Sequence, residues 1–156
     1  MSDRLTHLDE QGNAHMVDVG DKATTRRRAV AEAFVVMDPE VAGLVFGGGL
    51  PKGDAVAVAR VAAIMGAKQT ASLIPLCHPI GLDSVAVLIE PVEVGARIEV
   101  SCDVEARTGV EMEALTAASI GALALYDMIK GLDRGAEVGP VRLLTKSGGR
   151  SGDWAR

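Results

Sequence analysis

Apolar segments of contrasting periodicity follow one another along the chain, and their order limits the possible folds more than any other feature. Alternating and β-branched segments predict strands, whereas two longer segments rich in Ala and Leu predict helices. In chain order we expect a strand at 28–37, a helix at 54–71, strands at 83–92 and 97–106, a helix at 110–132 and a strand at 139–147. This βαββαβ order predicts an α+β fold of the ferredoxin-like type, with an antiparallel sheet and helices packed on one face.

Short signals complete the expected organisation. Asp38-Pro39 marks the start of a short extra helix, and the glycines at 47–49 should end it. The helix at 54–71 begins with residues that are apolar on nearly every side, which predicts a buried helix. A loop at 72–81, which contains two prolines, follows it.

A chain of 156 residues suits one domain. We predict a flexible N-terminal arm at 1–25 and a single ferredoxin-like domain at 26–156, with a flexible, Gly-rich C-terminal tail. Only 3% of the residues are aromatic, so smaller side chains, each burying less area, must build the core. Such a chain gains burial by oligomerising, and a second copy would cover the sheet face that the helices leave open.

The charge distribution argues against nucleic acid as a partner. The net charge is −5, whereas nucleic-acid-binding domains usually carry a basic excess, and RNA recognition needs aromatic residues on the sheet. The basic residues cluster at 26–28 and in 142–156, a pattern that suits a small polyanion.

Cys77 and Cys102 have no metal-binding spacing, so we expect free thiols and no metal. The N-terminus has no apolar signal region, and no apolar run is long enough to span a membrane. We therefore predict a cytoplasmic protein that does not contact membranes.

Lys52, Asp127 and Lys130 are the first candidates for chemistry. Lys52 follows a glycine-rich loop and precedes a helix, where backbone N–H groups attract anions; an ordinary exposed lysine is the alternative. Asp127 and Lys130 lie at i and i+3 on the predicted long helix, so they can form either a surface ion pair or an acid–base couple.

Other candidates lie at the opposite end of that helix and in two loops. Glu111 and Glu113 suit the start of a helix through its dipole alone. His78 is a candidate proton carrier or phosphate donor; a loop histidine that makes one backbone hydrogen bond is the alternative. Lys146 precedes small residues that could clamp phosphates, although a disordered tail has the same composition. Glu113 and Asp127 would be roughly 21 Å apart along a continuous helix. One small substrate in one chain could hardly touch both, so either the ends serve different purposes or a neighbouring chain completes the site.

Several of these segments together resemble the cyclic pyranopterin monophosphate synthase (MoaC) family. The resemblance covers nearly the whole chain, from about Leu5 to Trp154, and its two long motifs are specific. The matching segments are Met16-Val-Asp-Val, Lys52-Gly-Asp, Leu73-Ile-Pro-Leu-Cys-His-Pro, Thr108-Gly-Val-Glu-Met-Glu-Ala-Leu-Thr-Ala-Ala-Ser, Tyr126-Asp-Met, Gly139-Pro-Val-Arg-Leu-Leu and Lys146-Ser-Gly-Gly.

The resemblance implies a lyase of molybdenum cofactor biosynthesis. The family converts 3′,8-cyclo-7,8-dihydro-GTP, a small-molecule triphosphate, into a pterin with a cyclic phosphate and releases diphosphate, without a cofactor or a metal. It also implies a homohexamer built as a trimer of dimers, with active sites at the dimer interfaces. A regulatory small-molecule-binding module of the same fold is the alternative.

The resemblance also implies roles for single residues. Asp127, Lys130 and Lys52 match the catalytic positions. The substrate-binding positions are Leu76, Cys77, His78, Met112 and Glu113 and, further along the pocket, Glu111, Arg27 and Lys146. We hypothesise that Lys52 and Lys130 lie close together with lowered pKa values, one of them acting as an acid or base.

Overall fold

The structure, a computed structural model, describes residues 8, 9 and 11–156, so part of the expected N-terminal arm, residues 1–7 and 10, lies outside the described residues. The strands form one antiparallel sheet in the order β2-β3-β1-β4-β5. The elements are β1 (Thr25–Val36), α1 (Pro39–Gly47), α2 (Ala55–Lys68), α3 (Thr70–Leu73), β2 (Ser84–Val92), β3 (Gly95–Ala106), α4 (Glu111–Ile129), β4 (Glu137–Ser147) and β5 (Trp154–Ala155).

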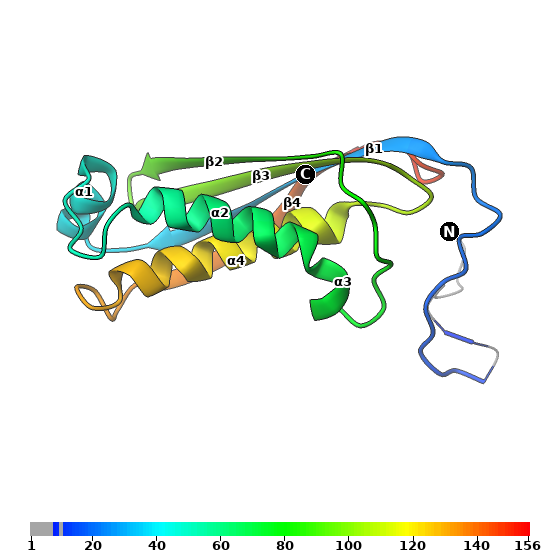
Figure 1. The fold of residues 1–156 in the computed structure, drawn as a ribbon, viewed down its shortest axis with the longest axis horizontal. Coiled ribbons are helices and arrows are strands. Elements are labelled where there is room, and N and C mark those ends of the chain that lie inside the picture. The colour runs from blue at the N-terminus through cyan, green and yellow to red at the C-terminus, as the bar shows by residue number, and fades with distance from the viewer. Residues whose placement is uncertain (1–7, 10) are drawn as a thin grey trace.

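The predicted α+β, ferredoxin-like fold is confirmed. β1 pairs with β3 on one side and β4 on the other, so both βαβ halves are split as this topology requires. The long helices α2 and α4 lie side by side on one face of the sheet, with α1 at one end and α3 at the other (Figure 1).

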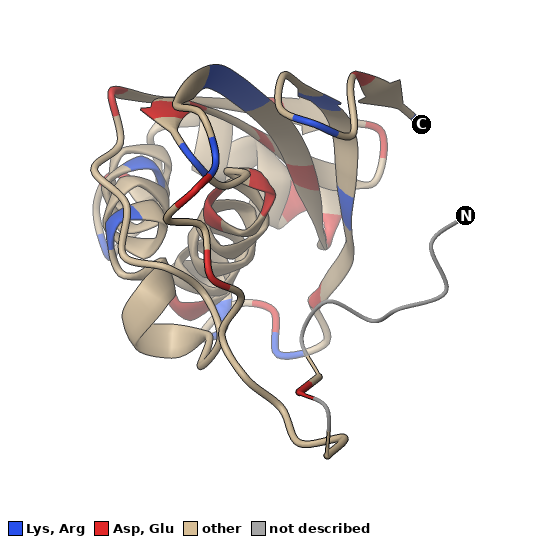
Figure 2. Cartoon of the chain, turned by 90° about the vertical axis from the view of Figure 1, so that its right-hand side faces the viewer, with Lys and Arg blue, Asp and Glu red and all other residues tan. Residues whose placement is uncertain are grey.

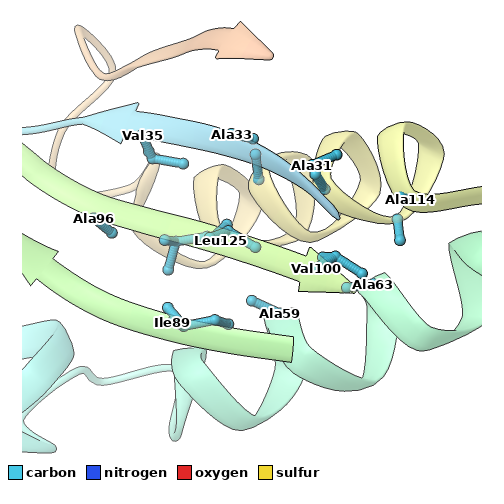
Figure 3. Packing of buried hydrophobic residues seen from close by; sticks show 14 of the residues in the cluster. Ala31, Ala33, Val35, Ala59, Ala63, Ile89, Ala96, Val100, Ala114 and Leu125 are labelled. Atoms are coloured by element: carbon cyan, nitrogen blue, oxygen red, sulfur yellow. The ribbon is translucent and has the colours of Figure 1, made fainter. Parts of the chain in front are cut away.

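The core between sheet and helices is built from small apolar side chains. Ala31 and Ala33 of β1, Ala59 and Ala63 of α2 and Ala114 of α4 all belong to this core, and each is fully buried (Figure 3). Two glycines let the helices come close to each other. A Cβ on Gly66 would lie 2.9 Å from Ile120 Cβ, and one on Gly121 would lie 3.1 Å from the Cβ of Ala63.

The structure differs from the expected elements at two places. The helix predicted at 54–71 is divided, because α2 ends at Lys68 and the short α3 follows after Gln69. The Thr70 hydroxyl donates to the carbonyl oxygens of Gly66 and Ala67, a local side-chain bond that competes with a continuing helix. Near the C-terminus, β5 pairs Trp154 with Lys146, an element that the sequence did not predict.

The sheet face away from α2 and α4 carries paired charges. The buried Glu32 carboxylate accepts hydrogen bonds from Arg97 Nε and Arg142 Nε, each at 2.6 Å. Burial raises the pKa of Glu32, but the two guanidinium groups outweigh it and the net pKa is lowered. Coverage of this face by a second copy stays a prediction.

Within the described part of the chain, one helix, α4, is long and apolar enough to cross a membrane by length and composition alone. Half of its apolar window is buried within the fold, as expected for a core helix that packs on a sheet.

Candidate functional site

The three predicted catalytic residues lie together at the C-terminal end of α4. Lys130 Nζ lies 2.6 Å from Asp127 Oδ1, and Lys52 Nζ lies 3.4 Å from Asp127 Oδ2. Lys52 Nζ also donates to the Asp127 carbonyl oxygen at 2.7 Å. The loop before α2 therefore brings Lys52 to a helix turn that is distant in sequence.

The charges of this trio bear on the hypothesis that Lys52 and Lys130 have lowered pKa values. The hydrogen bond and charge of Asp127 raise the pKa of Lys130, and those of Lys130, with a smaller contribution from Lys52, lower the pKa of Asp127. The hypothesis was wrong for Lys130, because its hydrogen bond to Asp127 and the charge of that carboxylate favour the protonated ammonium group and outweigh desolvation. These two shifts keep Asp127 and Lys130 charged at neutral pH, and all three side chains are exposed, so the trio can meet a ligand on the surface.

A cavity of about 240 Å³ lies at the other end of α4, where the helix begins. It brings together most of the predicted substrate-binding residues. Its walls are Val17, Val19, Lys22, Leu76, Cys77, His78, Thr108, Gly109, Glu111, Met112 and Glu113.

One wall of this cavity comes from the N-terminal segment, which sequence reasoning did not assign to the site. His78 Nε2 lies 2.7 Å from the carbonyl oxygen of Val17, so the ring nitrogen donates there and holds the segment against the proline-rich loop. Val19 and Lys22 continue the wall. The Met16-Val-Asp-Val motif was the signal that could have placed this segment at the site.

Glu113 is the strongly perturbed carboxyl of the cavity. The residue is 4% exposed, and burial raises the pKa of its carboxyl to about 7, with a smaller contribution from Glu111. Burial and the charge of Glu113 also raise the pKa of the Cys77 thiol. Glu113 can therefore hold or release a proton near neutral pH, whereas Cys77 stays a neutral thiol.

The arginines of β1 point to opposite faces of the sheet. Arg28 and Arg26 turn to Asp103, with distances of 3.0 Å and 4.0 Å between nitrogen and carboxylate oxygen. Arg27 turns to the other face, where its Nε donates to the carbonyl oxygen of Ala106 at 3.1 Å. Arg27 therefore lies on the helix side of the sheet, although it does not line the cavity around Glu113, and its role in substrate binding stays a prediction.

Lys146 lies close to the same end of α4. Its Nζ is 3.8 Å from Glu111 Oε1 and hydrogen-bonded to the Ser151 hydroxyl. The candidate residues thus form two groups, the trio around Asp127 and the cavity around Glu113, at opposite ends of α4. Over the described part of the chain, no group of three or more His, Cys, Asp and Glu side chains is placed as metal ligands would be.

The sequence predicted that Glu113 and Asp127 lie far apart along one continuous helix, and the separation of the two groups confirms this prediction. α4 is one continuous helix of 19 residues, so its ends are not brought together within the chain (Figure 1). A single chain therefore does not surround one small molecule with both the trio and the cavity.

Comparison with known proteins gives a consistent result over nearly the whole length. The MoaC family model matches residues 16–149. A Brucella ovis protein and a Brucella abortus protein, each called cyclic pyranopterin monophosphate synthase, are 55% identical to this chain, covering 99% of it and 95% of their own length. A Brucella canis protein of the same name is 54% identical over the same shares.

Proposed function

The chain belongs to the MoaC family, and we propose that it is a cyclic pyranopterin monophosphate synthase of molybdenum cofactor biosynthesis. The observation that carries this function is the family match, which spans both the trio around Asp127 and the cavity around Glu113. The substrate would be the cyclised GTP derivative, 3′,8-cyclo-7,8-dihydro-GTP. The products would be the pterin with its cyclic phosphate and diphosphate.

We propose lyase chemistry for the phosphate step. An oxygen of a substrate hydroxyl bonds to the α-phosphorus, the bond from that phosphorus to the oxygen bridging to the β-phosphorus breaks, and diphosphate leaves with the electron pair. The hydroxyl proton passes to the Asp127 carboxylate, which accepts it late because its pKa is lowered. Lys52 and Lys130 neutralise the charge that develops on the phosphate oxygens.

We assign the rearrangement of the ring system to the cavity around Glu113. This step moves protons without a redox change, and Glu113 has a pKa near neutrality that suits both giving and taking a proton. Leu76 and Met112 supply apolar surface for a flat ring, and His78 holds the wall beside it. Glu111 and Lys146 lie at the margin of this cavity.

The working site in this proposal is shared between two chains. Because the trio and the cavity lie at opposite ends of α4, one chain supplies the trio and its neighbour supplies the cavity of each site. A homohexamer arranged as a trimer of dimers would contain such sites at each dimer interface. We place the enzyme in the cytoplasm, which suits the two free thiols, Cys77 and Cys102.

The experiment that tests the function follows product formation directly. The purified protein is incubated with the cyclised GTP derivative, and diphosphate and the pterin product are quantified together. We expect both products in equal amounts from the unmodified protein and neither from Asp127→Asn. Tight binding without either product would instead identify a regulatory module, and neither binding nor product would contradict the assignment.

A further inference from the structure

Gly109 lies just before α4, in the wall of the cavity around Glu113. A Cβ at this position would overlap Glu111 Oε2 and would lie 2.7 Å from Glu111 Cδ and 2.9 Å from Glu111 Oε1. The Glu111 carboxylate therefore occupies the volume that a side chain at position 109 would need. The missing Cβ of Gly109 forms a seat for this carboxylate.

The need for glycine at this position comes from Glu111 and not from the backbone. Gly109 is outside the set of glycines with positive φ, so its backbone conformation suits other residues as well. The three atoms nearest to an added Cβ all belong to the end of the Glu111 side chain, which is flexible. Gly109→Ala therefore fits the chain once that carboxylate has moved, and it can displace Glu111 without disturbing the core.

The seat holds the Glu111 carboxylate close to a cation and beside a second carboxyl group. Lys146 Nζ lies 3.8 Å from Glu111 Oε1. Glu111 and Glu113 both line the cavity, and the charge of Glu111 adds to burial in raising the pKa of Glu113. Figure 2 faces the end of the molecule where α4 begins, and acidic and basic residues lie on the segments that meet there. Displacement of Glu111 would remove a partner from Lys146 and a like charge from Glu113.

Other titratable groups also surround Glu113. They come from the N-terminal segment, α2, the loop before β2, and β3, and they are Lys22, Lys68, Cys77, His78 and Cys102. Burial and the charge of Glu113 raise the pKa of both thiols, so the cysteines stay neutral near pH 7. Among the groups that the structure describes, Glu111 is the one whose charge shifts the pKa of Glu113. A change at position 109 therefore reaches Glu113 through Glu111.

We propose that Gly109 is a positioning residue of the active site, which seats the Glu111 carboxylate against Lys146 and beside Glu113. Gly109 acts through Glu111 and supplies no reacting group of its own. The inference rests on the proposed function, since the ring rearrangement assigned to Glu113 requires this carboxyl group to give and take a proton. The seated Glu111 carboxylate helps Glu113 to keep its proton up to near neutral pH, ready to be given to the substrate ring.

A titration of the ligand-free, full-length protein tests the seat without turnover. The NMR signal of the Glu113 side-chain carboxyl carbon, assigned by its loss in Glu113→Gln, reports the pKa of this group. We expect Gly109→Ala to lower that pKa in the same direction as Glu111→Ala, because both variants remove the charge of Glu111 from its place. Gly43→Ala makes the same change where no atom lies within 4 Å, so this matched control should leave the pKa unchanged. An unchanged pKa of Glu113 in Gly109→Ala would overturn the proposal.

A double variant distinguishes an effect through Glu111 from a direct effect of the new methyl group on the cavity. Gly109→Ala should change nothing further in a Glu111→Ala background, because the atoms that it displaces are gone. We therefore expect the double variant and Glu111→Ala to share one pKa of Glu113 and one kcat/KM. A further loss of activity in the double variant would mean that the methyl group blocks the cavity, which contradicts a positioning role. If Gly109→Ala alone lowers the Tm, recovery in the double variant would assign the strain to Glu111, whereas a Tm that stays low would refute the seat.

Kinetics separate this proposal from the proposed function. With the cyclised GTP derivative, we expect Gly109→Ala to lower kcat/KM by roughly 10- to 100-fold, as a misplaced group in an active site does. The descending limb of its pH profile should move to lower pH, since Glu113 would lose its proton earlier. Turnover with an unchanged rate and pH profile in Gly109→Ala would overturn the positioning role and leave the function intact. A pKa of Glu113 that falls in Gly109→Ala, in a protein that makes no product, would overturn the function alone.

Discussion

Glu113 occupies the first turn of α4, where the positive end of the helix dipole favours an ionised carboxylate. Burial opposes this effect and prevails, because the side chain is almost completely removed from water and Glu111 lies nearby. From the sequence, the helix dipole alone could explain why Glu111 and Glu113 lie at the start of the helix. Which of them is buried depends on how the loop at 76–78 packs over α4, and this packing leaves no signal in the local sequence.

The raised pKa of Glu113 predicts a pH dependence of stability. Between pH 4.5 and 7 the folded chain holds a proton that the unfolded chain has released, so the free energy of unfolding falls as pH rises. Across this window, the free energy of unfolding of Glu113→Gln should rise relative to that of the unmodified protein by on the order of 3 kcal/mol. Urea unfolding at pH 4.5 and pH 8 measures the difference. A constant difference between the two proteins would mean that the carboxyl titrates normally.

Asp127 should show the opposite combination, a large effect on activity and a small one on stability. Its side chain is 58% exposed and its partners are two exposed lysines, so an ion pair there adds little to folding. We expect Asp127→Asn to lower the rate of diphosphate release at least ~100-fold with an almost unchanged Tm. Glu93→Gln, which alters another exposed carboxylate, is the matched control for activity. A large fall in Tm in Asp127→Asn would instead assign this residue a structural role.

The arginines of β1 show where sequence reasoning had an unused signal. Side chains alternate along a strand, so Arg27 shares a face with Ala29 and Ala31, which pack under the helices, whereas Arg26 and Arg28 share the other. Alternation alone could thus have placed Arg27 on the helix side. Thr25 lies on the same face, but its missing hydrogen-bond partner is visible only in three dimensions.

At the level of elements, the close contact of α2 and α4 is set by residues with small or absent side chains. Gly66 of α2 lies against Ile120, and Gly121 of α4 lies against Ala63. A helix interior ordinarily prefers alanine to glycine, so these glycines are explained by the space that the neighbouring helix occupies. The apolar character of both helices, which the sequence shows directly, follows from this burial.

Two glycine substitutions separate helix propensity from helix packing. Gly43→Ala in α1 has no atom within 4 Å of the new methyl group and should stabilise the protein by about 0.5–1 kcal/mol. Gly66→Ala brings the same gain but places a methyl group 2.9 Å from Ile120 Cβ, which cannot swing aside, and should destabilise by about 1–2 kcal/mol. Urea unfolding of the two variants gives the comparison. Stabilisation by Gly66→Ala would mean that the helices separate at no cost.

Element order was the part of the fold that the sequence predicted well, because each long segment has a clear period and the βαββαβ order permits few topologies. The missed parts are short. α3 is a single turn that follows a break at Gln69, and β5 is a two-residue strand that exists only because it reaches the edge of β4. Neither is long enough to show a period, so both depend on tertiary contacts.

For the whole molecule, the main consequence of the fold is the distance between the trio and the cavity. α4 packs along the sheet without a break, so no bending of the chain can bring Asp127 to Glu113. The helix spacing already predicted this separation from the sequence. The partner chain that would bring the two groups together could not be derived from it, because an interface depends on surfaces that a single sequence leaves unspecified.

Mixed oligomers test the shared site. Asp127→Asn and Glu113→Gln should each be inactive alone, because one lacks the trio and the other the proton carrier. If each site combines the trio of one chain with the cavity of its neighbour, random 1:1 mixing by co-expression leaves about a quarter of the sites with both groups intact. We therefore expect about a quarter of the activity of the unmodified protein. Mixing Asp127→Asn with Lys130→Met is the matched control and should recover nothing, since both changes lie in one trio. If the first mixture recovered no activity, the whole site would lie within one chain, an arrangement that the straight course of α4 argues against.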